Sequence, residues 1–178
     1  MDFEYLINNY IIKKLSPDDD LTNFCCGLND MDNFLKNDAL IQQQNKLNVT
    51  YLVICNDEIV GFFSLLADNI EIKKVNEDYN IEYENCPAVK IGRLAIDKKY
   101  RNMGFGTLIL DNICGNIKSM SEKLGIRFIT VDAYCNVRQF YYNNKFNHIK
   151  IKNLKKLKRN AERNEKTTIS LYKDIKRI

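Results

Sequence analysis

Hydrophobic and polar positions follow one another in segments whose spacing predicts a mixed α/β fold. Short runs rich in β-branched and aromatic residues indicate strands, and apolar positions three or four residues apart indicate helices that bury one face. Strands are predicted over residues 11–15, 51–55, 59–66, 89–96, 128–133, 146–149 and 167–172. Helices are predicted from an N-cap at Asn29 or Asp30 through Leu40, over 107–124 and over 136–145. The order predicts a mixed α/β sheet flanked by helices, in a single domain spanning residues 1–178.

Individual residues predict where these elements turn and end. Asn56, Asp57 and Glu58 separate two strand runs and predict a β-hairpin. Gly92, inside a strand that is apolar on both faces, indicates a bulge or a close backbone approach at the centre of the sheet. Gly125 is placed to end the helix over 107–124. The buried face of that helix is expected to hold Leu108, Ile109, Ile113, Ile117, Met120 and Leu124. The charged segment 69–85 is left open as a short helix or a loop.

The most informative segment is Arg101-Asn102-Met103-Gly104-Phe105-Gly106, which joins the strand over 89–96 to the helix over 107–124. A helix N-terminus carries positive charge, and its first N–H groups lack partners within the helix, so it attracts anions. Gly104 and Gly106 have no Cβ, which lets a bulky anion approach the main chain. The segment predicts a site for a phosphate-bearing ligand, and an ordinary glycine turn is the alternative.

Two other phosphate-binding motifs are absent from the sequence. No Gly-x-x-x-x-Gly-Lys-Ser/Thr stretch occurs, which argues against a P-loop nucleotide site. Ile109 stands where a dinucleotide-binding fingerprint has its third glycine, and the chain does not start with a βαβ unit. The phosphate ligand is therefore expected to belong to another class.

Composition narrows the setting in which the protein works. Its 178 residues are 45% hydrophobic and 28% charged, which is ordinary for a globular domain with a sizeable core. The longest apolar runs, such as 59–67, are far too short to span a bilayer. The N-terminus has acidic and aromatic residues where a signal peptide has basic ones. We therefore expect a cytoplasmic protein with no membrane partner.

The cysteines and the single histidine argue against metal and hydrolase chemistry. None of the six cysteines forms a Cys-x-x-Cys pair, so zinc spacing is absent and no metal is expected. Cys55 and Cys114 lie in apolar segments and are expected to be reduced core residues. His148 falls in the strand over 146–149 and is expected to be structural, because it has no visible catalytic partner and no Gly-x-Ser-x-Gly elbow exists.

The phosphate-binding segment matches Arg/Gln-x-x-Gly-x-Gly/Ala, and in this the chain resembles the GNAT acetyltransferase superfamily. Ile91-Gly92-Arg93-Leu94-Ala95-Ile96-Asp97 resembles the central strand of that family. Val137-Arg138-Gln139-Phe140-Tyr141 resembles the Ala-x-x-Phe-Tyr stretch that carries the family's tyrosine. Lys145-Phe146 replaces the usual Gly-Phe, which puts the turn after this tyrosine in doubt. The resemblance implies a mostly antiparallel sheet and acetyl-CoA as the co-substrate.

The same resemblance implies which residues contact acetyl-CoA. The diphosphate is expected on the backbone of Arg101, Asn102, Met103, Gly104, Phe105, Gly106 and Thr107. The pantetheine arm is expected to pair with the backbone of Leu94, Ala95 and Ile96, where a backbone N–H would also stabilise the oxyanion. Phe140 is expected to line the cofactor site, and Asn136 either bonds the cofactor arm or caps the helix that follows it.

The expected reaction is a direct attack of a primary amine on the thioester, because holding both in attack geometry lowers the barrier substantially. An α-amino group, with a pKa near ~8, loses its proton more readily than a lysine with a pKa near ~10.4. Tyr141 is expected to donate a proton to the departing sulfur; the alternative is a packed aromatic residue. Tyr142 is the fallback donor, and a nucleophilic Cys135 is disfavoured because nothing basic is placed to lower its pKa.

The N-terminal half resembles one subclass, the GNAT toxins. The stretches that carry this resemblance are Phe24-Cys25-Cys26-Gly27, Met31, Phe34-Leu35, Ala39 and Gln42-Gln43. It implies the amino group of an aminoacyl-tRNA as the acceptor and a DNA-binding antitoxin as a partner. The segment 150–166 is longer than the toxin pattern leads us to expect.

Positive charge gathers near the C-terminus of a chain whose net charge is +4. The residues concerned are Lys150, Lys152, Lys155, Lys156, Lys158, Arg159 and Arg163. They form either a solvated face or a track for tRNA phosphates, which would give salt-sensitive binding. No aromatic residue stands between Lys150 and Arg163, so base stacking is not implied there.

Several alternatives stay open at the level of the sequence. A general base is not assigned among Glu82, Glu84, Arg93 and Asp97. The acceptor could instead be a small molecule or a protein. The chain could also be a non-catalytic acyl-CoA-binding module, or an RNA- or antitoxin-binding protein with a vestigial transferase fold. A homodimer is compatible with the sequence, which does not decide the oligomeric state.

Overall fold

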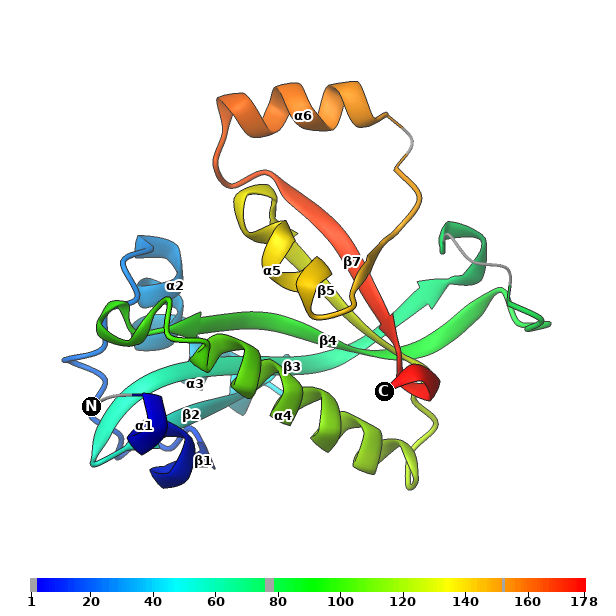
Figure 1. Ribbon diagram of the computed structural model, residues 1–178. Helices are drawn as coiled ribbons and strands as arrows, with labels where there is room; N and C mark the ends of the chain where they lie inside the picture. Colours follow the sequence, from blue (N-terminus) through cyan, green and yellow to red (C-terminus); the bar gives the residue numbers. More distant parts are fainter. Residues whose placement is uncertain (1–2, 76–78, 152) are drawn as a thin grey trace. The chain divides into compact units, whose positions relative to one another are not determined.

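The computed structural model describes residues 3–75, 79–151 and 153–178, and Figure 1 labels its helices and strands. The chain divides into two compact units, one made of the residues up to Leu66 with Ile91–Asp111, the other of Ala67–Lys90 with Asn112–Ile178. Strands β3 (Glu58–Glu71) and β4 (Asn85–Ile96) contribute residues to both. Seven strands form one sheet in the order β1-β2-β3-β4-β5-β7-β6. The expected mixed, mostly antiparallel sheet is confirmed.

The first unit begins with a short helix and an antiparallel strand arrangement. Helix α1 (Phe3–Asn9) leads into β1 (Tyr10–Lys14), which pairs antiparallel with β2 (Val49–Cys55), and β2 pairs antiparallel with β3. Asn56 and Asp57 both have positive φ, 52° and 61°. This is the two-residue turn whose twist matches a β-hairpin, so the predicted hairpin is confirmed. Helix α1 was not predicted because it buries a single side chain, Leu6, and shows no helical period.

The predicted helix from Asn29 onward is built from three successive pieces. These are α2 (Asn29–Asn33), the π-helical η1 (Phe34–Asp38) and α3 (Ala39–Gln44). The N–H of Ala39 donates to the carbonyl of Phe34, five residues back, which widens the helix at this point. The expected cap at Asn29 or Asp30 is wrong, since the N-cap is Leu28 and no side chain caps the helix. The buried side chains of η1 and α3 pack in a core with Phe24, Leu52 and Phe62.

Helix α4 (Phe105–Ser121) follows β4 through the one-turn η3 (Lys98–Tyr100). It begins two residues before the expected start at residue 107 and ends three residues before the expected end at residue 124. Leu124 therefore lies beyond the helix, and both Leu124 and Met120, which is in the last turn of α4, are exposed rather than buried as expected. Gly125 does not adopt the left-handed conformation and is not the C-cap that we expected. The residues that do form the buried face are Ile109, Leu110, Ile113, Cys114 and Ile117.

The second unit holds the C-terminal strands and helices, whose bounds are η2 (Ile72–Lys74), β5 (Phe128–Tyr134), η4 (Cys135–Val137), α5 (Arg138–Asn143), β6 (Asn147–His148), α6 (Leu154–Arg163), β7 (Thr168–Asp174) and η5 (Ile175–Arg177). Strand β7 pairs antiparallel with both β5 and β6. Its core is aromatic: the ring of Phe128 meets those of Tyr79 and Tyr172 edge-on, at 5.4 and 5.9 Å between centroids. The segment 69–85 was left open as a short helix or a loop. Its first residues form the end of β3 and the one-turn η2, and residues 76–78 lie outside the described residues.

Candidate functional site

The turn between β4 and α4, in the first unit, leaves its main chain open to a ligand. Asn102 and Gly104 both take positive φ, 61° and 86°, and α4 then begins at Phe105. The carbonyl of Gly104 accepts hydrogen bonds from the N–H groups of Thr107 (3.0 Å) and Leu108 (3.3 Å). The N–H groups of Phe105 and Gly106 belong to the first helical turn and have no acceptor within the helix. The turn therefore presents backbone donors at the positive end of a long helix.

Side chains hold this turn without covering it. Phe105 is fully buried and its ring meets Tyr10 edge-on at 5.6 Å, which anchors the start of α4. Arg101, Asn102, Gly104 and Thr107 are exposed. A Cβ added to Gly104 would lie 3.7 Å from the ring of Phe3, an ordinary contact. The positive φ, rather than lack of space, is what requires glycine there.

The guanidinium of Arg101 donates a hydrogen bond to the carbonyl of Cys26. Asp97 is 3% exposed, and its carboxylate accepts hydrogen bonds from the N–H groups of Cys25 and Lys99, both at 2.9 Å. Because both carboxylate oxygens serve backbone donors, Asp97 is a structural residue and not a candidate general base. These contacts join the segment that resembles GNAT toxins to the phosphate turn.

The end of β4 is tightly packed against β3. The N–H of Asp97 donates to the carbonyl of Val60 at 2.9 Å. A Cβ on Gly61 would lie 2.9 Å from Ile96 Cδ1 and 3.0 Å from the carbonyl oxygen of Ala95, and a Cβ on Gly92 would lie 2.9 Å from Leu66 Cδ2. The close backbone approach predicted at Gly92 is confirmed. Ala95 is buried, and Leu94 and Ile96 are half-buried.

Tyr141, in the second unit, is held by the C-terminal cap of helix α5. The N–H of Phe146 donates to the Tyr141 carbonyl and the N–H of Lys145 to the Tyr142 carbonyl, both at 3.0 Å, while Lys145 has φ 63°. This is the Schellman arrangement, in which a left-handed residue ends the helix. The rings of Tyr141 and Phe146 complete it, edge-on at 5.5 Å. Lys145 thus takes the left-handed conformation that glycine usually takes at this position. The turn after Tyr141 is formed even though Lys145-Phe146 replaces the usual Gly-Phe.

The Tyr141 side chain is 6% exposed, and its hydroxyl makes no hydrogen bond within the described part of the chain. Burial raises the pKa of this phenol well above its ordinary value of ~10, so the group stays protonated at neutral pH. A buried, protonated and unpaired hydroxyl suits a proton donor. Tyr142, the fallback, is half-buried with its ring 6.3 Å from that of His148.

The residues expected near Tyr141 differ in how far they are exposed and in what they contact. The ring of Phe140 is half-buried and meets that of Tyr141 edge-on at 5.0 Å. Asn136 is exposed in η4 and does not cap α5, whose N-cap is Val137 without a side-chain bond. The capping alternative for Asn136 is therefore wrong, and cofactor contact stays a prediction. Cys135 is buried, with its carbonyl accepting from Arg138.

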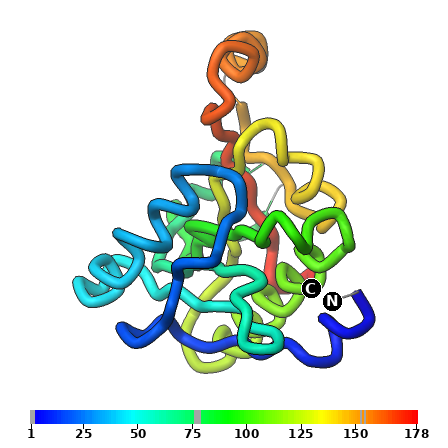
Figure 2. Tube along the Cα trace, turned by 90° about the vertical axis from the view of Figure 1, so that its left-hand side faces the viewer, coloured from blue at the N-terminus to red at the C-terminus, as the bar shows by residue number. Residues whose placement is uncertain are grey.

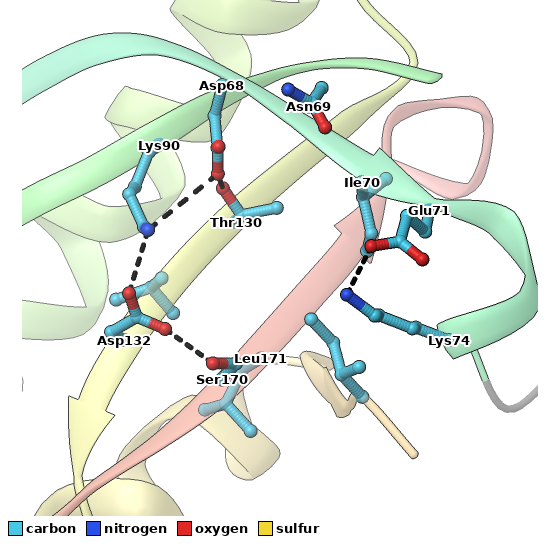
Figure 3. Close-up of a pocket in the computed structure, with 12 residues that line it drawn as sticks. Asp68, Asn69, Ile70, Glu71, Lys74, Lys90, Thr130, Asp132, Ser170 and Leu171 are labelled. Atoms are coloured by element: carbon cyan, nitrogen blue, oxygen red, sulfur yellow. Dashed lines mark hydrogen bonds and ion pairs between the residues drawn. The ribbon is translucent and has the colours of Figure 1, made fainter. Parts of the chain in front are cut away.

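A polar cavity of about 250 Å³ also lies in the second unit (Figure 3). Lys90 bridges two carboxylates, Asp132 at 2.7 Å and Asp68 at 3.9 Å. The hydroxyls of Ser170 and Thr130 donate to Asp132 (2.6 Å) and Asp68 (2.5 Å). Burial acts to raise the pKa of Asp132, but the hydrogen bonds from Lys90 and Ser170 outweigh it and lower that pKa. A carboxylate with a lowered pKa is a weak base, so the cavity does not supply the missing general base.

Sequence reasoning missed this cavity, although one signal was present. Lys90 is a charge inside an otherwise apolar strand run, and Asp132 is another. Charges at such positions need partners when the strand is central. The remaining candidate bases are ordinary surface groups: Glu84 pairs with Lys73 at 2.8 Å, Glu82 is exposed, and Arg93 lies over the ring of Phe34 at 4.9 Å.

The basic segment forms helix α6, whose charged side chains Lys155, Lys156, Lys158, Arg159 and Arg163 are all exposed. Lys150 is exposed too, and Lys152 lies outside the described residues. Within residues 3–75, 79–151 and 153–178, no cluster of side chains could hold a metal ion, and the cysteines form no disulfide bond. No helix in this described part is long and apolar enough to cross a membrane.

No family model matches the chain, but individual proteins do. A tRNA-acetylating toxin of Mycobacterium tuberculosis is 24% identical over 131 residues, which are 72% of this chain and 79% of that protein. A probable toxin TacT of Sinorhizobium fredii is 27% identical over 134 residues, 69% of this chain and 71% of that protein.

Solved structures share the fold over nearly the whole chain. AtaT complexed with acetyl-methionyl-tRNAfMet has a TM-score of 0.80 at 24% identity, covering 95% of this chain and 96% of that one. A Tyr→Phe variant of KacT has a TM-score of 0.80 at 22% identity with the same coverage. AtaTR bound with acetyl-CoA has a TM-score of 0.76 at 24% identity, covering 96% of each chain. The chain thus has the fold of AtaT and KacT over nearly its whole length, and over about 70% of its length it is similar in sequence to a tRNA-acetylating toxin and to a probable toxin TacT.

Proposed function

We propose that this protein is an acetyl-CoA-dependent N-acetyltransferase that acetylates the amino group of an aminoacyl-tRNA and acts as the toxin of a toxin–antitoxin pair. The observation that carries the proposal is the likeness, at a TM-score of 0.80 over 95% of the chain, to AtaT holding acetyl-methionyl-tRNAfMet. The similar tRNA-acetylating toxin supports the same reaction class, and the similar probable toxin TacT supports the toxin role. AtaT bound to the C-terminus of its antitoxin AtaR supports an antitoxin partner.

The turn at the start of α4 fits the diphosphate of acetyl-CoA. The turn from Arg101 to Thr107, in which Arg101, Asn102, Gly104 and Thr107 are exposed, is proposed to offer N–H donors at a helix N-terminus, and Gly104 keeps the approach clear of a side chain. Acetyl-CoA supplies the activated acetyl group as a thioester. The backbone of Leu94, Ala95 and Ile96 is proposed to align the pantetheine arm and to stabilise the oxyanion. Asn136 and Phe140 are proposed as further contacts.

The transfer requires one bond to form and one to break. The amine nitrogen attacks the thioester carbonyl carbon, the C–N bond forms, and the C–S bond breaks. Tyr141 gives its hydroxyl proton to the departing sulfur, and the amine releases a proton to water. An α-amino group, with a pKa near ~8, is already partly neutral at pH 7, so no strong base is needed. An α-amino acceptor therefore suits a site in which no general base has been assigned among the described residues.

Acetyl transfer from labelled acetyl-CoA tests the proposal. The wild-type protein is incubated with aminoacyl-tRNA, with deacylated tRNA and with a panel of small amines and peptides. We expect label only on aminoacyl-tRNA, recovered as an N-acetyl-amino acid after alkaline cleavage of the ester. Label on a small amine or peptide instead would contradict the acceptor. Binding of acetyl-CoA without release of thiol from any acceptor would indicate a non-catalytic module.

A second test addresses the toxin role. Expression in a bacterial host is expected to arrest growth, and Tyr141→Phe is expected to relieve the arrest at equal protein level. Co-expression of a small DNA-binding protein encoded next to this chain is expected to relieve it too. Growth arrest that persists in the Tyr141→Phe variant would separate toxicity from acetyl transfer.

A further inference from the structure

We propose that one face of helix α6 is the surface on which this protein binds RNA phosphates, and that it docks the tRNA part of the acceptor. The identity of the partner, an aminoacyl-tRNA, rests on the proposed function; what is new is the surface that binds it. Figures 1 and 2 show α6 standing away from the strands of its unit, between the segment that follows β6 and the segment that precedes β7.

The helix separates its residues by chemistry. Lys155, Arg159 and Arg163 are four residues apart and follow one side of the helix about 6 Å from one another, with Lys156 beside them. All four are exposed. Leu157 and Ala161 are half-buried on the opposite side. The cationic face thus points away from the packed side.

No ion pair of the described residues neutralises this face, although Glu162 lies on the same side of the helix as Arg159. Between residues 153 and 166 the sequence has six lysines and arginines and two glutamates, Glu162 and Glu165. Within the described residues, Lys155, Lys156, Arg159 and Arg163 form no ion pair. A row of unpaired cations spaced along a rigid element complements a polyanion.

The sequence is also unfavourable for a helix that works alone. Like charges four residues apart, as in Lys155–Arg159 and Arg159–Arg163, destabilise a helix. The first turn carries cations and no acidic residue, which opposes the helix dipole. Two features compensate in part: the side chain of Asn153 accepts from the N–H of Lys156 at 2.9 Å, and Arg163 places a cation in the last turn. Bound phosphates would relieve both the repulsion between like charges and the unfavourable charge in the first turn. Local sequence that disfavours the element it forms is typical of binding sites.

RNA fits this face better than an acidic protein does. Side chains of Lys and Arg contact phosphates without needing shape complementarity, and from residue 155 to residue 163 the helix exposes no aromatic or large apolar side chain. The expected contacts are with the backbone, since no ring is available for base stacking. Binding should accordingly depend on salt and hardly on tRNA sequence.

The test compares two double variants with equal loss of charge. Arg159→Gln with Arg163→Gln removes two cations from the face, and Lys123→Gln with Lys176→Gln removes two exposed lysines elsewhere in the unit. Binding of deacylated tRNA is measured over a series of salt concentrations. We expect the α6 variant to bind on the order of tenfold more weakly near physiological salt, with its log–log salt slope shallower by about 1.5–2. The lysine control is expected to keep most of the wild-type affinity and most of the wild-type salt slope. The melting temperature of the α6 variant should not fall.

Activity assays separate this proposal from the proposed function. The α6 variant should raise KM for aminoacyl-tRNA while kcat and the rate with an aminoacyl ester of adenosine, which lacks the tRNA phosphates, stay unchanged. Equal salt slopes for the two double variants would overturn the surface, even if the wild type acetylates aminoacyl-tRNA. A loss of binding confined to an acidic protein partner would overturn it too. A wild type that binds tRNA through α6 but transfers no acetyl group would uphold the surface and contradict the proposed function.

Discussion

The carboxylate of Asp97 accepts a hydrogen bond from the backbone N–H of Cys25 at 2.9 Å, across 72 residues of sequence. The N–H of Lys98 donates in return to the carbonyl of Cys25 at 3.0 Å. The bonds fasten the segment that resembles GNAT toxins to the chain just ahead of the phosphate turn. Asp97 is thereby a positioning residue for the turn rather than a group that touches substrate.

Removing this carboxylate is expected to destabilise the fold. In Asp97→Ala, the N–H groups of Cys25 and Lys99 lose their acceptors in a buried place, which costs on the order of 2–4 kcal/mol. Urea unfolding measures the change. Asp18→Ala, at an exposed aspartate, is the control and should change the free energy of unfolding by less than about 0.5 kcal/mol. Equal stability of the two variants would show that the bonds to Asp97 contribute little.

Gly104→Glu is expected to abolish acetyl-CoA binding measured by calorimetry. The new carboxylate would face the phosphates, and a side chain at φ 86° adds strain to the turn. Gly27→Glu is the matched control, because Gly27 has φ 77° and nothing within 4 Å of an added Cβ. It introduces the same charge and similar strain outside residues 101–107, one residue after Cys26, the partner of Arg101, and should retain binding. Wild-type-like affinity in Gly104→Glu would count against the placement of the diphosphate.

Tyr141→Phe is expected to slow turnover while affinity for acetyl-CoA stays nearly intact, because it removes a proton and little volume. The effect on kcat should be about 10²–10⁴-fold, the usual range for a general acid. Since burial raises the pKa of Tyr141, the phenol stays protonated, and loss of its proton should produce no fall in wild-type kcat up to at least pH ~10. Tyr142→Phe is the control. An unchanged rate in Tyr141→Phe would give the role to another group.

Lys145→Gly is expected to stabilise the protein by about 0.5–1 kcal/mol. The residue has φ 63°, which costs energy for any side chain with a Cβ, and glycine relieves that cost while adding some entropy to the unfolded state. Lys46→Gly, at φ 61°, offers a second lysine in the same conformation and should behave alike. Denaturant unfolding checks both. A loss of stability at Lys145 alone would mean that its side chain contributes to the helix cap.

The sequence by itself determined the elements and the phosphate turn, because both depend on neighbouring residues. The strand over 128–133 and the hairpin turn at Asn56-Asp57 were read from local periodicity and turn chemistry, and the glycine turn from residues 101–106. Helix ends were less predictable: the N-cap of α2 is the apolar Leu28, and α4 ends at Ser121 with no residue there that the pattern marks as a stop.

Only the tertiary structure decided what individual side chains do. Asp97 was a candidate base until its two oxygens were found on the N–H groups of Cys25 and Lys99. The network of Asp68, Lys90 and Asp132 joins residues from separate strands. The burial of Tyr141 against Phe146 and the projection of α6 likewise arise from folding. Burial and pairing are set by contacts between distant parts of the chain, and local spacing carries no record of them.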